Sequence, residues 1–267
     1  MPGGRFAALV LAGDRTPDDA LLVASGHGCK ALLEIAGVPM VLRVLQALEA
    51  ATEIEAIHLS GPGPDSVAGS SLLGDYIGAH GVRWQAPRAT PSTSAYATLA
   101  AIEPATPVVL TTADHPLLQP EHIDYFCKAA ATSGADVAVG LAPYARVREI
   151  FPGMKKTVLS FRDDAYCGCN LFAFLSPAGR TMADRWREVE SERKSPLRVI
   201  RLLGWSAVLR YRMGLLSLDG AMELLSRRMG LRFAAIRMPF GDAAVDVDSL
   251  SDHALVEQRL LERQARA

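Results

Sequence analysis

Short apolar runs alternate with segments of helical periodicity along most of the chain. Residues 6–12 form the first run, which ends at Gly13, and residues 107–112 form another, which is rich in β-branched side chains. Uninterrupted runs of this length are typical of strands that are buried on both faces of a sheet. By the same reasoning, we predict further strands at residues 55–60, 82–85, 136–141, 171–175 and 232–238.

Helices are predicted between these strands. Residues 39–51 place their large apolar side chains on one stripe, as an amphipathic helix does. A second helix is predicted at 94–102, after a loop in which Ser92, Thr93 or Ser94 could cap it. The same pattern predicts helices at residues 120–133, through most of 177–230, and after residue 248.

The alternation of strands and helices predicts the fold class. It is typical of a three-layer α/β/α protein with a mostly parallel central sheet. Because right-handed crossovers place the loops after the strands along one edge, ligands are expected there. We find no internal repeat and no low-complexity linker, so residues 1–267 are interpreted as one domain with a helical insertion at about 177–230.

Composition narrows the class of protein further. Lys and Arg number 28 against 29 Asp and Glu, which argues against a bulk-electrostatic nucleic-acid binder. The 49% of hydrophobic residues excludes a disordered chain, and no apolar run is long enough to span a membrane. The first residues lack the pattern of a signal peptide, and the spacing of the four cysteines fits neither a disulfide framework nor a zinc site. A cytoplasmic protein with reduced thiols is expected.

Candidate chemistry begins where the first strand ends. A glycine at this place, Gly13, lets successive backbone N–H groups approach phosphate oxygens, and Arg15 and Lys30 would add positive charge beside them. An ordinary strand-to-helix turn with solvated basic residues explains the same pattern equally well.

Acidic residues follow two other predicted strands. Asp114 comes directly after the run at 107–112, and a carboxylate there suits Mg²⁺ that is shared with substrate phosphates. Asp246 and Asp248 alternate along a predicted extended segment, so both would lie on one side of it. The alternatives are that Asp114 caps a turn, and that residues 245–248 form a surface strand before a helix capped by Ser249 or Ser251.

The order of these residues resembles a known family. Leu11, Ala12 and Gly13, followed by residues 30–33 and 37–40, resemble the opening of nucleotidyltransferases with a GT-A-like fold. These include sugar-1-phosphate nucleotidyltransferases, cytidylyltransferases of isoprenoid synthesis, and molybdenum cofactor guanylyl- and cytidylyltransferases. Residues 108–118 and 244–252 are similar to the family segments that supply two metal ligands. Asp14 replaces the family's second glycine, and Cys29 replaces its proline.

The resemblance implies a reaction and a set of roles. A nucleoside monophosphate would pass from an NTP, with CTP or GTP favoured, to a phosphorylated small-molecule or lipid-precursor acceptor, and pyrophosphate would be released. Mg²⁺ or Mn²⁺ would be the cofactor. The implied catalytic residues are Lys30 and Arg15; the metal ligands are Asp114, Asp248 and Asp246; and the nucleotide-binding residues are Leu11, Ala12, Gly13, Asp14, Thr93 and Ser94.

The acceptor side is less defined by the sequence. Gly168 and Asn170 lie where related enzymes place an acceptor loop, and Lys155, Lys156 and Arg162 could hold an acceptor phosphate unless they form a solvated face. The apolar face of the insertion, which includes Trp205 and Leu209, could pack on the core, form a homodimer or lie on a membrane surface.

Two other functions stay open. A glycosyltransferase with the same fold, which uses a nucleotide-sugar donor, would also need an acidic metal site, although it would not need Lys30. A catalytically silent nucleotide-binding protein is the second alternative, because Asp14 and Cys29 depart from the family pattern.

Overall fold

The computed structural model describes residues 4–13, 21–22, 28–183 and 204–265. The strands are β1 (Phe6–Leu11), β2 (Glu34–Ile35), β3 (Val38–Pro39), β4 (Ile54–Ser60), β5 (Arg83–Gln85), β6 (Val108–Thr112), β7 (Val137–Pro143), β8 (Leu159–Ser160), β9 (Ala165–Phe174) and β10 (Phe233–Arg237). The helices are α2 (Met40–Ala50), α3 (Pro64–Ala68), α4 (Ser71–Ala79), α5 (Pro91–Ala100), α6 (Pro120–Thr132), α7 (Tyr144–Ile150), α8 (Pro177–Arg180), α11 (Trp205–Arg212), α12 (Leu218–Met229) and α13 (Leu250–Gln264). Two short 3₁₀ helices, η1 (Lys30–Leu32) and η3 (Asp242–Ala244), complete the set.

One large sheet carries the fold. Its strand order is β10-β7-β9-β6-β1-β4-β5, and β8 pairs with β9 outside this path. Strand β9 is antiparallel to both of its neighbours in the path, β6 and β7, whereas the other pairs in the path are parallel. The prediction of a mostly parallel sheet flanked by helices is therefore confirmed.

The direction in which successive strands of the chain join the large sheet reverses at β1. The next strand of this sheet along the chain, β4, lies on one side of β1, whereas β6 lies on the other side. Side chains of β1 are buried on both faces, as its apolar sequence predicts. A crevice for ligands forms at such a reversal, outside the carboxyl ends of the strands. Gly13 and Asp114 follow two strands that meet there.

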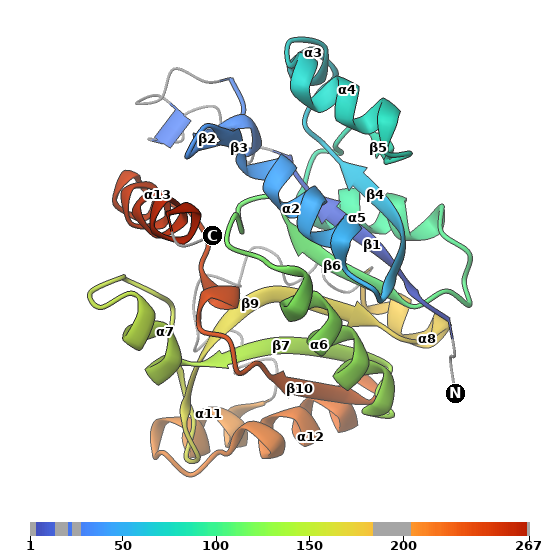
Figure 1. Cartoon of the computed structure of the whole chain (residues 1–267). Coiled ribbons are helices and arrows are strands. Elements are labelled where there is room, and N and C mark those ends of the chain that lie inside the picture. Colours follow the sequence, from blue (N-terminus) through green and yellow to red (C-terminus); the bar gives the residue numbers. More distant parts are fainter. Residues whose placement is uncertain (1–3, 14–20, 23–27, 184–203, 266–267) are drawn as a thin grey trace.

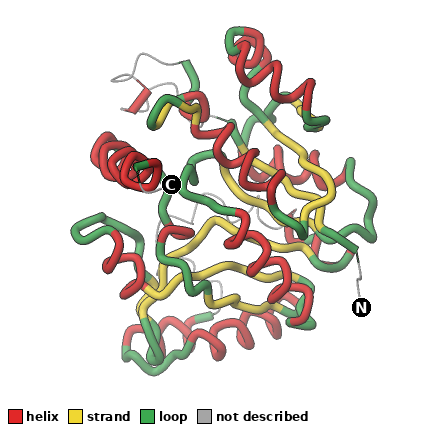
Figure 2. The backbone as a smooth tube through the Cα atoms, in the orientation of Figure 1, coloured by secondary structure: helices red, strands yellow, loops and turns green. Residues whose placement is uncertain are grey.

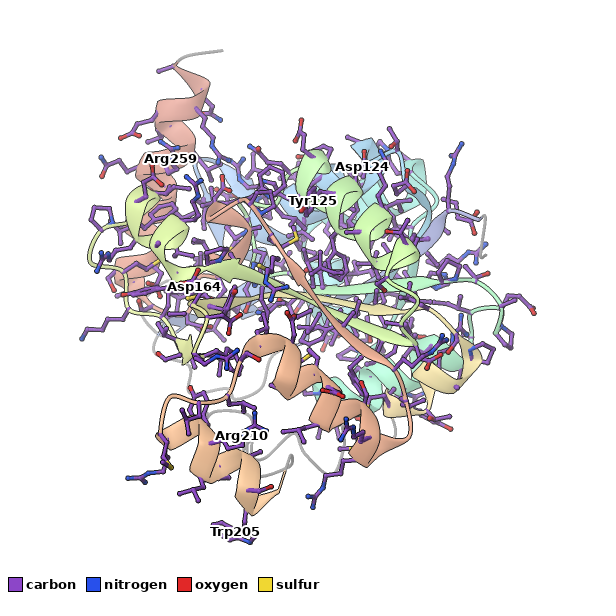
Figure 3. The ribbon with its side chains drawn as sticks, turned by 90° about the horizontal axis from the view of Figure 1, so that it is seen from below. Asp124, Tyr125, Asp164, Trp205, Arg210 and Arg259 are labelled. Carbon is purple, nitrogen blue, oxygen red and sulfur yellow. The ribbon has the colours of Figure 1, made fainter. Side chains whose placement is uncertain are left out.

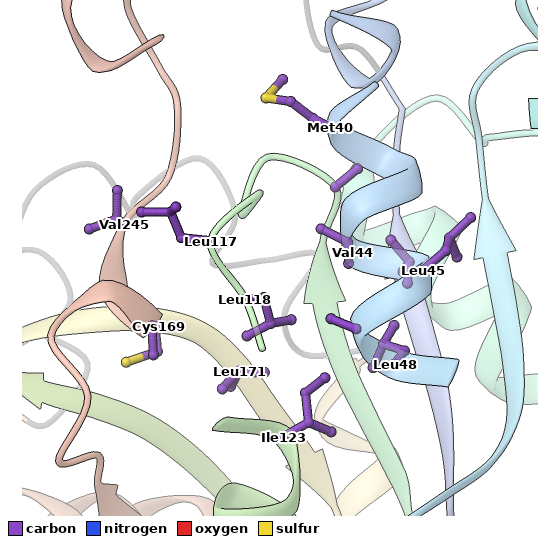
Figure 4. Packing of buried hydrophobic residues seen from close by; sticks show 14 of the residues in the cluster. Met40, Val44, Leu45, Leu48, Leu117, Leu118, Ile123, Cys169, Leu171 and Val245 are labelled. Carbon is purple, nitrogen blue, oxygen red and sulfur yellow. The ribbon is translucent and has the colours of Figure 1, made fainter. Parts of the chain in front are cut away.

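Helices cover the sheet on both faces (Figures 1 and 2). Apolar side chains of α2 and α6 belong to the main core, whereas those of α5 pack in a separate cluster with β1, β6 and β9 on the other face. Figure 4 shows Val44, Leu45 and Leu48 of α2 with Leu118 and Ile123 as members of one buried cluster. This double cover explains why the sequence of the central strand β1 is apolar throughout.

Two sequence predictions need correction. Helix α5 begins at Pro91 rather than at Ser94, and its N-cap is Thr90 instead of Ser92, Thr93 or Ser94. The hydroxyl of Thr90 accepts a hydrogen bond from the Thr93 N–H, and proline suits the first helical position because it has no N–H to satisfy. Residues 245–248 lie between η3 and α13 without forming a strand.

The segment at 177–230 contains α8, α11 and α12 in its described part. Residues 184–203 of the predicted insertion lie outside the described residues. Figure 3 shows Trp205 and Arg210 at the periphery, on the helix α11. Trp205 is 73% exposed and Leu209 is 61% exposed, whereas Leu216 is fully buried. The predicted apolar face is thus packed only in part, and whether it forms a homodimer or contacts a membrane surface stays a prediction. No helix in the described part of the chain has the length and apolarity needed to cross a bilayer.

A carboxylate at the start of β7 joins three segments. Asp136 accepts hydrogen bonds from the backbone N–H of Arg232 (2.9 Å), from the Arg232 guanidinium (3.1 and 3.2 Å) and from the Ser176 hydroxyl (2.8 Å). The hydrogen bonds from Arg232 are the main reason why the pKa of Asp136 falls to about 2. Asp136 thereby connects the entry of β10 to the end of β9.

We predict that the Asp136→Asn variant is less stable than the parent by about 1–2 kcal/mol at pH 7. The carboxyl titrates near 3.8 when unperturbed and near 2 in the fold, so its contribution is complete above pH 4 and disappears as the pH falls through 2. Urea unfolding curves at several pH values measure this. The exposed Asp75 supplies the control, because Asp75→Asn should change stability little at any pH. An equal loss for Asp136→Asn at pH 7 and pH 2 would contradict the prediction.

Candidate active site

Three distant parts of the chain meet at the carboxyl edge of the sheet. The Ala113 N–H donates to the carbonyl of Leu11, which joins the ends of β6 and β1 (2.9 Å). The Val247 N–H donates to the carbonyl of Asp114, which brings in the segment before α13 (3.0 Å). Backbone hydrogen bonds therefore fix where the side chains of Asp114 and its neighbours stand.

Lys30 connects two of the acidic residues. Its Nζ donates to Oδ1 of Asp248 at 2.6 Å and to Oδ2 of Asp114 at 3.3 Å. Lys30 is the first residue of η1, whose middle residue Ala31 is buried, so the short helix is anchored to the core. The Lys30 side chain is only 16% exposed. The charges around it are consistent with this position: burial opposes the ammonium form, but Asp114 and Asp248 outweigh it and raise the pKa of Lys30.

Asp114 stays ionised although it is largely enclosed. Its Oδ1 accepts a hydrogen bond from the Thr112 hydroxyl (2.6 Å), and its Oδ2 faces Lys30. Burial alone would raise the pKa of this carboxyl, but the charge of Lys30 and the hydrogen bond from Thr112 are among the influences that together lower it to about 2. At neutral pH the residue therefore presents a carboxylate, the form that binds a cation.

Asp246 belongs to a separate ion pair. Its Oδ1 contacts Nζ of Lys156, whose side chain is almost completely buried. Asp246 and Asp248 thus pair with different lysines. Val245 and Val247 are buried while the two aspartates are less enclosed, so the segment keeps the predicted alternation although it forms no strand. Ser249 caps α13 by accepting from the Asp252 N–H, as one of the open alternatives predicts.

Asn170, on β9, contacts His115, the residue that follows Asp114. Between the pairs Val139–Phe172 and Leu141–Gly168, β9 holds two extra residues, and Asn170 has a φ of +46° there. Its Nδ2 lies 2.8 Å from Nε2 of His115, which is 1% exposed. Bulges and left-handed non-glycine residues concentrate at functional sites, where they redirect a side chain. Burial lowers the pKa of His115, so it meets Asn170 as a neutral ring.

The loop after β1 is packed between two neighbouring loops. A Cβ on Gly61, whose φ is +85°, would lie 2.8 Å from the backbone of Ala12 and Gly13. On the other side, a Cβ on Gly13 would lie 3.1 Å from Cβ of Pro87. Sequence reasoning did not include Gly61 or Pro87 in the site, although the Gly-Pro-Gly-Pro run after β4 marks a loop. These contacts fix the backbone of residues 12 and 13 and leave Gly13 exposed.

The structure brings only some of the predicted residues together. Among the predicted nucleotide-binding residues, Ala12 is buried, and Ser94 accepts a hydrogen bond from the Arg88 N–H in the loop beside Gly13 (2.8 Å). Thr93 lies in the first turn of α5. Asp14 and Arg15 lie outside the described residues, so their predicted roles are neither supported nor opposed by the geometry.

The predicted acceptor residues are divided in the same way. Lys156 contacts Asp246, and Asn170 contacts His115, the neighbour of Asp114. Gly168 is an exposed position of β9, and Lys155 is exposed. The Arg162 N–H donates to the carbonyl of Leu216, which ties its turn to the segment between α11 and α12 (2.8 Å).

Asp114 and Asp248 can hold a metal ion only if ligands from outside the protein complete its coordination. No group of three or more His, Cys, Asp or Glu side chains is arranged for metal binding in the described ranges. Asp114 and Asp248 are two carboxylates that converge on one cation, the ammonium of Lys30. Two carboxylates fit Mg²⁺ that completes its coordination with substrate phosphates and water, and do not form an all-protein cage.

The fold is that of the α/β proteins of the nucleotide-diphospho-sugar transferase type. The sequence matches the MobA-like NTP transferase domain over residues 8–219, and the chain belongs to this family. A hypothetical transferase from Thermus thermophilus is 28% identical with a TM-score of 0.75, over 93% of this chain and 99% of that one. No curated protein matches the sequence.

Two more distant structures share the fold. A CMP:2-keto-3-deoxy-manno-octonic acid synthetase, solved with CTP, has a TM-score of 0.58 at 13% identity and covers 97% of this chain and 99% of its own. A 4-diphosphocytidyl-2C-methyl-D-erythritol synthase from Anaerococcus prevotii has a TM-score of 0.57 at 11% identity, with 97% of each chain covered. The nucleotidyltransferase resemblance is therefore confirmed at the level of family and fold.

We predict that Gly61→Ala destabilises the protein by at least about 2 kcal/mol, because the new methyl group meets backbone atoms and the left-handed φ adds strain. Gly63→Ala in the same loop is the matched control. A Cβ there meets nothing within 4 Å and its φ is −60°, so its effect should stay below about 0.5 kcal/mol. Urea unfolding measures both, and similar losses for the two variants would show that the packing of Gly61 on residues 12 and 13 is not the cause.

Proposed function

We propose that this protein transfers a nucleoside monophosphate from an NTP, CTP or GTP, to a phosphorylated small-molecule or lipid-precursor acceptor and releases pyrophosphate. The observation that carries the proposal is the position of Lys30, which contacts both Asp114 and Asp248 where β6 ends beside β1. Family membership supports nucleotide transfer in general, and the geometry supports a site for a cation and a polyphosphate.

Each group has a role in this proposal. The backbone N–H groups around Gly13 face the phosphates, as glycine at a strand end permits. Asp114 and Asp248 hold Mg²⁺ or Mn²⁺, which when bound neutralises charge on the triphosphate. Lys30 stabilises the negative charge that develops on the α-phosphoryl oxygens. An oxygen of the acceptor attacks the α-phosphorus, and the bond from that phosphorus to the pyrophosphate oxygen breaks.

The proposed sites of the two substrates lie on either side of Asp114. Gly13 and the start of α5 lie on the β1 side of Asp114, whereas Asn170 on β9 lies on the other side. We therefore assign the nucleotide to the β1 side of Asp114 and the acceptor to the β9 side, where Asn170 and the ion pair of Lys156 with Asp246 lie. Arg162 and Lys155 are weaker candidates for the acceptor because neither contacts the acidic cluster among the described residues.

The choice of nucleotide is a finer proposal. The two distant structures are a synthetase solved with CTP and a diphosphocytidyl synthase, so CTP is the first nucleotide to test. GTP is the second, since the resemblance of the opening segment includes guanylyltransferases. A thermal-shift screen of the four NTPs with Mg²⁺, followed by phosphorylated polyols, sugars and lipid head groups, identifies the pair.

We predict that Lys30→Met and Asp114→Asn each lower turnover by at least about a hundredfold, as the loss of one electrostatic group at a reacting phosphate does. Pyrophosphate release on the identified substrate pair measures this, and circular dichroism checks the fold. Lys128→Met and Asp75→Asn remove equal charges at exposed positions and should keep normal turnover.

Three outcomes would contradict the proposal. Normal rates for Lys30→Met and Asp114→Asn would remove these residues from the reaction. Sugar transfer from a nucleotide-sugar donor without pyrophosphate release would favour a glycosyltransferase. Nucleotide binding without turnover on any acceptor would favour a silent binding protein.

A further inference from the structure

The ammonium of Lys30 contacts one oxygen of each of the two carboxylates that a metal ion would share. Of the two oxygens of Asp114, Oδ1 accepts from Thr112 and Oδ2 faces Lys30 at 3.3 Å. Oδ1 of Asp248 lies 2.6 Å from the same ammonium. Lys30 is separated from these two residues by 84 and 218 positions in the sequence, so the contacts are a product of the tertiary fold.

A divalent cation and an ammonium group seek the same partners. Both bind carboxylate oxygens, and two cations that share one pair of carboxylates repel each other strongly at these distances. Asp246 gives no substitute ligand, because the buried Lys156 already neutralises it. A metal ion can therefore take Asp114 and Asp248 together only if Lys30 moves away from them.

We propose that Lys30 is an internal counter-cation that competes with the divalent metal for Asp114 and Asp248. The metal by itself then binds weakly, and it binds strongly once nucleotide phosphates give the ammonium another anionic partner. This inference rests on the proposed function for the identity of the phosphates. Linkage makes the effect reciprocal: the bound metal releases Lys30 toward the phosphates as much as the phosphates release the carboxylates to the metal.

The first test is a titration with Mn²⁺ alone, without nucleotide, by calorimetry and by the electron paramagnetic resonance of free Mn²⁺. We expect Lys30→Met to bind Mn²⁺ at least about tenfold more tightly than the parent, since a competing cation is removed while the carboxylates stay. Lys128→Met, which removes an exposed positive charge on α6, should bind as the parent does. Adding Asp114→Asn to Lys30→Met should abolish the gain.

The second test needs no substitution, and it covers the case in which Lys30→Met does not fold. The intact protein is acetylated with a water-soluble ester, and mass spectrometry gives the rate for each lysine. We expect saturating Mn²⁺ alone to raise the rate at Lys30 by about threefold or more, since the metal displaces its ammonium from the carboxylates. The rate at the exposed Lys128 should not change.

Unchanged or weaker Mn²⁺ binding by a folded Lys30→Met, or an unchanged or lower acetylation rate at Lys30 with saturating Mn²⁺, would overturn the inference. Absence of Mn²⁺ binding in both proteins would overturn it as well. These readouts use neither nucleotide nor acceptor. A failure of the pyrophosphate assay, with the expected metal and acetylation results, would therefore count against the proposed function and not against the competition.

Discussion

Charge balance at one edge of the sheet is the constraint on which this structure depends. Two aspartates converge on one ammonium group where β6 ends, and the largely enclosed Asp114 would be costly to keep ionised without a cation beside it. Lys30 is that cation, and the segment that follows it also contacts α13, because the Ala36 N–H donates to Glu257 and His253 lies against the carbonyl of Glu34. The ion pairs and these hydrogen bonds together hold η1, the end of β6 and the segment before α13 at one place.

One backbone hydrogen bond and one further ion pair fix the positions of the three aspartates. The hydrogen bond from the Val247 N–H to Asp114 fixes the aspartates through the backbone, and the pair of Lys156 with Asp246 gives the neighbouring carboxylate its own cation. Asp246 therefore has a lysine of its own, whereas Asp114 and Asp248 share Lys30. This division separates the pair of carboxylates that can take a common cation from the third.

Much of the fold and part of the site follow from the sequence. Continuous apolar runs gave β1 and β6, because strands buried on both faces need nonpolar side chains throughout. The resemblance singled out Lys30, Asp114 and Asp248, which the structure brings into contact. The contact of Asn170 with His115 could not be predicted, because it depends on a bulge in β9 and a bulge leaves no periodic pattern in the sequence. The packing of Gly61 on the loop after β1 depends likewise on the path of another loop.

The one strand that runs against its neighbours explains the division of the proposed site. Because β9 is antiparallel, it enters the edge where β6 and β7 end, and Asn170 in its middle lies beside His115. A parallel strand at this position would present only its last residues and a following loop there. The β1 side consists of backbone and helix start, which suit phosphates, whereas the β9 side offers a fixed amide and an enclosed lysine. For the proposed reaction, this asymmetry would offer the nucleotide and the acceptor two unlike surfaces on either side of Asp114.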